Sequence, residues 1–209
     1  MRAIVTLFTG LALALTLAAC QKGGGGAAAT ADDMSLGSPT AKVQITEYAS
    51  LGCPHCAAWN NEIFPQFKAK YIDTGKVHYT LREALTGAAD ISAAGFLTAR
   101  CAGKDKYFQV VDAVFRAMPN PETADQPKAA LLKIAQQVGL TEAQFQSCIT
   151  DKDALLALNK RWEKYVTDDK INATPTFIIN GKTYDKGELS MADLDAAVAE
   201  AEAGAGKPK

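Results

Sequence analysis

The chain has 209 residues, of which 48% are hydrophobic and 22% are charged, and its 22 basic and 23 acidic residues give a formal net charge of −1. This composition is typical of a globular protein with a buried core, and it argues against a disordered chain, a coiled coil and the strongly basic surface of a nucleic-acid partner. Five cysteines are too few for a small disulfide scaffold, and their odd number calls for an explanation by position.

Residues 1–19 have the pattern of an export signal. Arg2 gives a positive start, and an uncharged, mostly apolar stretch then ends in Leu-Ala-Ala directly before Cys20. This ending resembles a bacterial lipoprotein signal, which implies cleavage before Cys20 and attachment of a lipid to it. An uncleaved membrane anchor and plain secretion with a free Cys20 are the alternatives. The lipoprotein interpretation predicts a protein of the bacterial cell envelope, held to the membrane by lipid and facing the periplasm.

Residues 20–40 are predicted to form a flexible tether. Four glycines, Gly23 to Gly26, are followed by alanines and small polar residues. Such a segment has high chain entropy and little apolar surface to bury. We therefore expect the folded part of the chain to begin at residue 41.

Residues 41–87 are predicted to contain a strand, a helix and a second strand. Polarity alternates over residues 43–49 and again over 77–81, which indicates two half-buried strands. Between them, residues 54–71 carry apolar side chains at helical spacing, and Pro65 should kink this helix because it lacks an N–H group. A right-handed crossover makes the two strands a parallel pair.

Residues 88–167 carry no strand pattern and are predicted to form an inserted helical domain. The expected helices span residues 90–102, 105–117, 128–138, 142–149 and 152–167.

Residues 168–205 are predicted to complete the first domain. Strands at 176–179 and 182–184 flank Asn180-Gly181, a strong hairpin signal, and a last helix runs from 190 to 203. The fold class is therefore α/β, with a βαβ half, a ββα half and a helical domain inserted between them. This order resembles the thioredoxin fold.

Cys53-Pro54-His55-Cys56 lies where the first strand ends and the next helix begins. Residues three apart on a helix lie on one side, close enough for a disulfide after small adjustment. The free N–H groups and positive dipole end of the helix stabilise a thiolate at Cys53, and Pro54 suits the first helical position. His55 can add charge or a hydrogen-bond donor near the Cys53 sulfur. Because these effects favour the reduced form, they predict a strongly oxidising pair.

A zinc site and a structural disulfide are the alternatives for this motif. Zinc usually needs four ligands, whereas Cys101 and Cys148 are isolated and His78 is the only other histidine. A structural disulfide across so short a loop would constrain the unfolded chain little. We therefore expect no metal and no cofactor other than a redox-active Cys53–Cys56 disulfide.

The sequence resembles the bacterial DsbA-type thiol:disulfide oxidoreductases of the thioredoxin superfamily. The resemblance covers residues 41–203 and rests on the Cys53–Cys56 motif after a strand, on Thr174-Pro175 before the hairpin and on the helical insertion between them. It implies that Pro175 is cis and faces the active disulfide, and that Thr174 offers its backbone to an extended substrate. A trans proline that opens a strand is the alternative.

The resemblance also implies a function and partners. An oxidase of this type introduces disulfides into unfolded or partly folded exported proteins with free thiols, and a membrane partner of the DsbB type reoxidises it. Thr174 departs from the valine of the best-studied oxidases, so a disulfide isomerase or reductase stays an alternative. A non-enzymatic lipoprotein, such as a holdase with an inert disulfide, is another. Residues 21–40 are too short for the dimerisation domain of dedicated isomerases, and we expect a monomer.

Glu47 lies six residues before Cys53, on the otherwise apolar face of the first strand. Burial of a carboxyl group raises its pKa, so Glu47 could exchange a proton with Cys56 during turnover. A buried acid here is also a feature of the family that the sequence resembles. An exposed glutamate at a sheet edge is the alternative.

Cys101 and Cys148 are the two cysteines that remain. In an oxidising compartment they are expected to form a structural disulfide, worth roughly 3–4 kcal/mol in the chain-entropy model. Two buried free thiols or a second redox relay are the alternatives.

Overall fold

The computed structural model describes residue 30 and residues 32–204. The predicted export signal and the predicted lipid attachment at Cys20 lie outside the described residues. Within the described part, no helix has both the length and the apolar character that a membrane crossing requires.

A five-stranded sheet with the order β1-β3-β2-β4-β5 forms the centre of the molecule. The strands are β1 (Met34–Leu36), β2 (Val43–Ala49), β3 (Val77–Glu83), β4 (Thr176–Ile179) and β5 (Lys182–Tyr184). β2 and β3 are parallel, whereas β4 is antiparallel to both β2 and β5. The predicted parallel pair and the predicted hairpin are confirmed.

β1 corrects the prediction that residues 20–40 form a tether. Met34–Leu36 pairs antiparallel with β3, and Met34 is buried. A strand of three residues is too short to show an alternating pattern, so the sequence carried no signal for it. It is held in place by β3, which lies between β1 and β2 and has all seven of its residues buried. The ordered sheet therefore begins before residue 41.

The helix predicted for residues 54–71 is divided into three parts. They are α1 (Pro54–Glu62), α2 (Phe64–Phe67) and the π-helical turn Lys68–Ile72. α1 ends at Glu62, with Ile63 as its C-cap residue. Pro65 lies in the first turn of α2, where its missing N–H group leaves no hydrogen bond unmade. The break thus falls two residues before the proline that predicted the kink.

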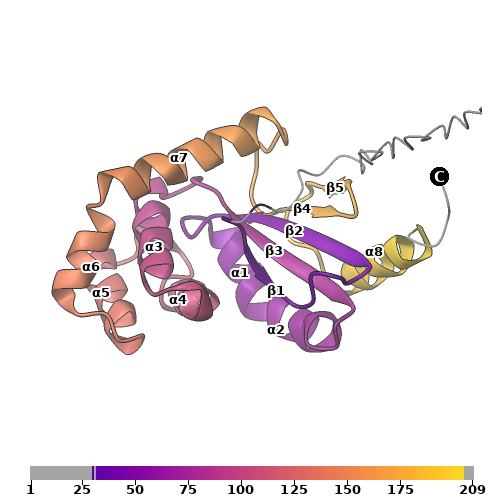
Figure 1. Ribbon diagram of the computed structural model, residues 1–209, viewed down its shortest axis with the longest axis horizontal. Helices are drawn as coiled ribbons and strands as arrows, with labels where there is room; N and C mark the ends of the chain where they lie inside the picture. The colour runs from indigo at the N-terminus through magenta and orange to yellow at the C-terminus, as the bar shows by residue number, and fades with distance from the viewer. Residues whose placement is uncertain (1–29, 31, 205–209) are drawn as a thin grey trace, which may run out of the picture.

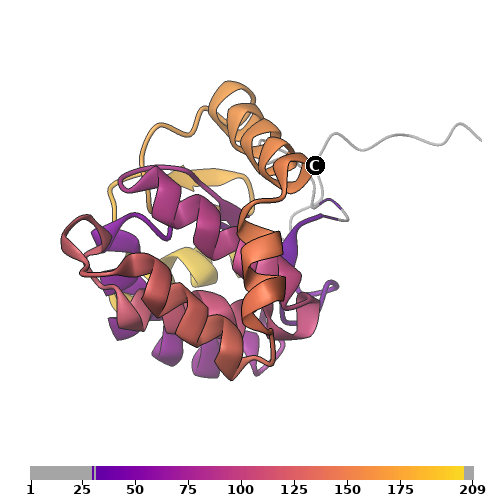
Figure 2. The ribbon, with the colours of Figure 1, turned by 90° about the vertical axis from the view of Figure 1, so that its left-hand side faces the viewer.

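Five helices lie between β3 and β4, as predicted. They are α3 (Ala89–Cys101), α4 (Lys104–Ala117), α5 (Pro127–Gln137), α6 (Glu142–Ile149) and α7 (Lys152–Thr167), with a short 3₁₀ turn at Pro121–Thr123. Figures 1 and 2 show α3 to α6 gathered beside one end of the sheet, while α7 leads back over it. A disulfide joins Cys101 at the end of α3 to Cys148 in α6, with the two Cα atoms 6.2 Å apart.

The two faces of the sheet bury different side chains. On one face, α1, α2 and α8 (Met191–Gly204) cover an aromatic cluster in which Trp59 contacts Phe67 and Phe177 (Figure 1). On the other face, Tyr48 of β2 packs edge-on against Tyr165 of α7. Burial of each such side chain stabilises the fold by roughly 1.5–3 kcal/mol before entropy losses. The sheet is thereby held rigid beneath the helix that carries the cysteines.

Two buried ion-pair groups join the end of β3 to its surroundings. Arg82 is 3.3 Å from Asp33 and 3.0 Å from Asp169. The Glu83 carboxylate accepts from Arg100 of α3 at 2.6 Å and from Arg161 of α7 at 2.7 Å. Buried charges persist only when they are paired in this way. The second group fixes the inserted helices relative to the sheet.

Candidate redox-active site

The cysteine motif lies at the junction of β2 and α1. Cys53 is the N-cap residue of α1 with an extended backbone, and Pro54 occupies the first helical position. Cys56 lies within the first turn and is completely buried, whereas Cys53 is 7% exposed. Both cysteines are free thiols in this structure. The motif therefore places one sulfur at the surface end of the helix and the other directly behind it.

Glycine allows the backbone before Cys53 to press against the entry to α3. The N–H group of Ala88 donates to the carbonyl of Gly52 at 3.1 Å. A side chain at Gly52 would clash with the Ala88 carbonyl, and one at Gly87, whose φ is +63°, would clash with the Gly52 carbonyl. This close approach fixes the loop that carries Cys53.

Hydrogen bonds made by hydroxyl groups connect this loop to Thr174, the residue before Pro175. Ser50 donates to the carbonyl of Thr86 at 2.8 Å, and its oxygen also lies 3.0 Å from the hydroxyl of Ser92 in α3. The hydroxyl of Thr86 is 2.6 Å from that of Thr174. Three segments that are distant in the sequence therefore meet beside Cys53.

Thr174-Pro175 faces the cysteine motif, and the peptide bond between these residues is cis. The Cys53 thiol donates to the Thr174 carbonyl, with sulfur and oxygen 3.3 Å apart. The structure thus brings together Cys53 and Thr174, which are 121 residues apart in the sequence.

The pKa values of the two thiols are shifted in opposite directions. The pKa of Cys53 is lowered to about 5, mainly because the Cys56 thiol donates a hydrogen bond to its sulfur. Hydrogen bonds from the Thr174 side chain and from the backbone N–H groups of Cys56 and His55 lower the pKa further, whereas burial opposes the shift. Burial, followed by the neighbouring Cys53, raises the pKa of Cys56 well above its ordinary value. Near neutral pH, Cys53 is a thiolate and Cys56 is a thiol. This is the asymmetry that a nucleophilic cysteine and a buried second cysteine require.

Glu47 lies beneath the motif and is only 2% exposed, so it is not at an exposed edge. Burial raises the pKa of Glu47 to about 8, although a hydrogen bond from Tyr79 lowers it in part; the Cys53 thiolate raises it further. The Glu47 charge in turn contributes to the raised pKa of Cys56. An acid that titrates close to neutral pH therefore lies within electrostatic reach of both sulfurs.

His55 points away from the buried side of the motif. Its Nδ1 atom is 2.9 Å from Oε1 of Glu188, in the loop between β5 and α8. The hydrogen bond to Glu188 is the main cause of the raised pKa of His55, and the Cys53 thiolate also contributes. Both side chains are exposed, at 73% and 37%.

Sequence reasoning did not identify Tyr79, Thr86 or Glu188. Tyr79 is a regular member of an alternating strand, and its position beside β2 was the only signal that could have linked it to Glu47. Thr86 and Glu188 lie in loops, which carry no periodic pattern.

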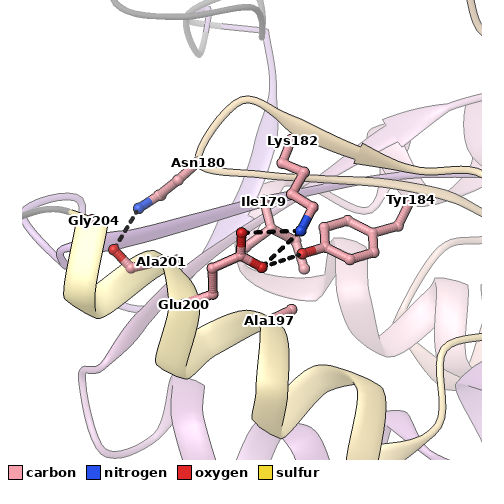
Figure 3. Close-up of a pocket in the computed structure, with 8 residues that line it drawn as sticks. All are labelled: Ile179, Asn180, Lys182, Tyr184, Ala197, Glu200, Ala201 and Gly204. Atoms are coloured by element: carbon pink, nitrogen blue, oxygen red, sulfur yellow. Dashed lines mark hydrogen bonds and ion pairs between the residues drawn. The ribbon is translucent and has the colours of Figure 1, made fainter.

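The cysteine motif lies apart from the pocket drawn in Figure 3. That pocket is lined by residues of the β4–β5 hairpin and α8, among them Asn180, Lys182 and Glu200. The register places Ile179 opposite Ile45, at the end of β2 away from Cys53. Within the residues that the structure describes, no group of three or more histidine, cysteine or acidic side chains could hold a metal ion.

Comparison with known proteins shows the family. A family model described as thioredoxin matches residues 29–200. A Rickettsia bellii protein provisionally named a protein-disulfide oxidoreductase is 31% identical over 173 residues, which are 81% of this chain and 66% of that protein. Disulfide bond formation protein D of Bacillus subtilis is 22% identical over 77% of this chain and 71% of its own length. The chain spans 55–66% of the length of its Rickettsia relatives.

Solved structures agree with the architecture. The crystal structure of Wolbachia pipientis alpha-DsbA1 superposes with a TM-score of 0.72 at 24% identity, over 85% of this chain and 94% of that one. Bacillus subtilis BdbD gives a TM-score of 0.71 at 20% identity, over 81% and 92%. The chain therefore belongs to the thioredoxin family and has the DsbA-type form of its fold, with a helical domain inserted between the two halves.

Proposed function

We propose that this protein is a thiol:disulfide oxidase that transfers a Cys53–Cys56 disulfide to unfolded or partly folded exported proteins. The observation that carries the proposal is the pairing of a thiolate at Cys53, whose pKa is about 5, with a buried Cys56 thiol behind it. Because this thiolate stabilises the reduced form, the enzyme readily transfers its disulfide to substrate thiols.

The transfer follows two exchanges. A substrate thiolate attacks the Cys53 sulfur of the oxidised enzyme, the Cys53–Cys56 bond breaks, and Cys56 leaves and gains a proton. A second substrate thiolate then attacks the substrate sulfur of the mixed disulfide, which releases Cys53 as its thiolate. Two substrate thiols are oxidised to a disulfide and the enzyme disulfide is reduced to two thiols. Cys53 leaves easily because a thiol of low pKa is a good leaving group.

The position of Thr174 supports binding of an extended substrate. Its carbonyl lies beside the Cys53 sulfur, next to Pro175, and backbone recognition of this kind accepts many sequences. We further propose that Cys20 carries the lipid that anchors a monomeric enzyme on the periplasmic side of a bacterial envelope, and that a membrane partner of the DsbB type reoxidises the cysteine pair.

Three assays test the proposal. Oxidised protein should restore activity to a reduced, unfolded disulfide-containing protein, and the Cys53→Ser variant should not. Cys101→Ser/Cys148→Ser, which also replaces cysteine by serine but leaves the Cys53–Cys56 motif intact, is the matched control. Faster repair of a scrambled substrate than oxidation of a reduced one would indicate an isomerase, and rapid insulin reduction would indicate a reductase. Equal activity of the Cys53→Ser variant would remove the enzymatic proposal and leave a binding lipoprotein.

A further inference from the structure

We propose that Tyr79 is a positioning residue that holds the Glu47 carboxylate for proton exchange with Cys56. This inference rests on the proposed function and deepens it. It concerns the step in which Cys56 must lose or gain its proton, and it assigns a role to a side chain that has no direct contact with substrate.

Tyr79 and Glu47 occupy neighbouring parallel strands. The register pairs Tyr79 of β3 with Ile45 of β2, so Glu47 is two residues further along the same face. The Tyr79 hydroxyl donates to Oε2 of Glu47. Both side chains are at most 2% exposed, so water does not compete for this hydrogen bond.

The Tyr79 ring is held so that its hydroxyl stays on Glu47. The ring packs against Phe64 with centroids 5.1 Å apart, against Phe67 at 6.5 Å and against Phe108 of α4 at 6.1 Å. These contacts come from both α2 and the inserted helical domain. Rotation of the hydroxyl away from the carboxyl group would therefore disturb the packed core.

Tyr79 is the polar group that balances the burial of Glu47. Among the described residues, Glu47 forms no ion pair with a basic side chain. The titratable groups around it are Cys53 and Cys56 at the start of α1 and Tyr79 of β3, with Tyr107 of α4 beyond Tyr79. Its β4 neighbour in the register is the apolar Phe177.

A neutral donor has a specific consequence for this carboxyl group. A hydrogen bond to the carboxylate favours the ionised form, whereas burial and the Cys53 thiolate oppose it. A lysine in the place of Tyr79 would add a full positive charge and hold the carboxylate ionised at neutral pH. The neutral tyrosine instead leaves the pKa of Glu47 at about 8, close enough to neutral pH for the carboxyl group both to accept and to return a proton.

The step that uses this arrangement is the attack of Cys56 on a mixed disulfide at Cys53. The Cys56 S–H proton passes to the Glu47 carboxylate, and the Cys56 sulfur forms a bond to Cys53. The bond between Cys53 and the substrate sulfur breaks, and the substrate leaves as a thiolate. In the reverse direction the departing Cys56 thiolate recovers its proton from Glu47.

Stopped-flow mixing of the reduced full chain with a chromophoric aryl disulfide measures this step. Cys53 attack releases a first equivalent of aryl thiol, and Cys56 attack on the resulting mixed disulfide releases a second. The rates are followed from about pH 5 to about pH 9, a range that includes the shifted pKa values of the Cys53 thiol and the Glu47 carboxyl group. Tyr79→Phe removes only the hydroxyl. Tyr107→Phe is the matched control, because Tyr107 is equally buried and its hydroxyl donates to Glu83, outside the site, at 3.0 Å.

In Tyr79→Phe the midpoint of the second phase should move about one pH unit higher, with roughly tenfold slower release below it, since a hydrogen bond to a charged group is lost. The first phase and the Tyr107→Phe profile should match the wild type. A 3-fluorotyrosine introduced at position 79, which keeps the packing and donates more strongly, should move the midpoint the other way. In a Glu47→Gln background, Tyr79→Phe should produce no further shift.

Coinciding second-phase profiles for wild type, Tyr79→Phe and Tyr107→Phe would overturn the assignment while leaving the oxidase proposal intact. An equal shift in Tyr79→Phe with and without Glu47 would also overturn it, since Tyr79 would then act by another route. Absence of the first phase in the wild type would instead contradict the proposed function, because Cys53 would not be the nucleophile.

Discussion

His55 Nδ1 lies 2.9 Å from Glu188 Oε1, and this contact joins the cysteine motif to the loop before α8. The loop is attached to α1 independently, because the Trp59 indole N–H donates to the Leu189 carbonyl at 3.0 Å. Ser190 and Asp193 then cap the start of α8 through reciprocal hydrogen bonds. Glu188 is therefore held at a fixed position over the motif, and it stabilises the positively charged form of His55.

The Glu188→Gln variant should lower the pKa of His55, because the carboxylate that stabilises the imidazolium is gone. NMR titration of the imidazole resonances measures this directly. Oxidation of the wild type to the Cys53–Cys56 disulfide should also lower the pKa of His55, since it removes the thiolate charge. Glu200→Gln, which removes an exposed carboxylate that pairs with Lys182 at 2.7 Å (Figure 3), is the matched control and should leave His55 unchanged. An unchanged His55 titration in Glu188→Gln would refute the coupling.

Alkylation of the reduced protein should follow the ionisation of Cys53 alone. The rate of iodoacetamide modification should rise through a midpoint near pH 5, because the low pKa of Cys53 leaves a thiolate above that value. Peptide mapping should find the label on Cys53, since Cys56 is buried and its pKa is raised. A midpoint near the ordinary cysteine value, or labelling of Cys56 first, would contradict the proposed asymmetry.

Glu47→Gln should become progressively stabilising, relative to wild type, as pH rises. The folded pKa of Glu47 is about 8 against an ordinary 4.5, so between these values the folded chain holds a proton that the unfolded chain releases. Wild-type stability therefore falls with rising pH across this window by up to about 1.4 kcal/mol per pH unit, and the glutamine variant lacks this loss. Urea unfolding of both proteins, with Cys53 and Cys56 reduced, at several pH values measures the difference. A constant difference would show that Glu47 titrates normally.

Removal of the inserted-domain disulfide should affect stability and leave the chemistry intact. Cys101→Ser/Cys148→Ser should lose about 3–4 kcal/mol of unfolding free energy, because the bond joins residues 47 apart in the chain. Its aryl disulfide kinetics should equal those of wild type, since the bond joins α3 to α6 away from the motif. Loss of Cys53 reactivity with unchanged stability would assign the pair a redox role instead.

The sequence predicted those parts of the fold that carry strong local patterns. Alternation identified β2 and β3, and helical spacing identified the five inserted helices to within one or two residues. β1 was missed because three residues cannot show a period and because its stability comes from pairing with β3. Pro65 predicted a kink within residues 54–71, whereas the helix breaks at Ile63, and the π-helical turn after α2 has no signature in the sequence.

The residues of the candidate site also differ in how far the sequence could predict their positions. The motif and Glu47 are close in the chain, so strand and helix geometry was enough to place them together. Thr174 could be placed only through the resemblance, because 121 residues separate it from Cys53. Tyr79 and Glu188 needed the three-dimensional structure, since their partners are set by strand register and by the path of a loop.

The reduction potential of the Cys53–Cys56 pair tests the central claim most directly. Equilibration of the full chain with glutathione redox buffers, followed by quantitation of the free thiols, gives this value. An oxidase built on a stabilised Cys53 thiolate predicts a potential closer to the value of about −120 mV known for DsbA than to the value of about −270 mV known for thioredoxin. A potential at or below about −230 mV would contradict the account, because the disulfide would then be too stable to be donated to exported proteins.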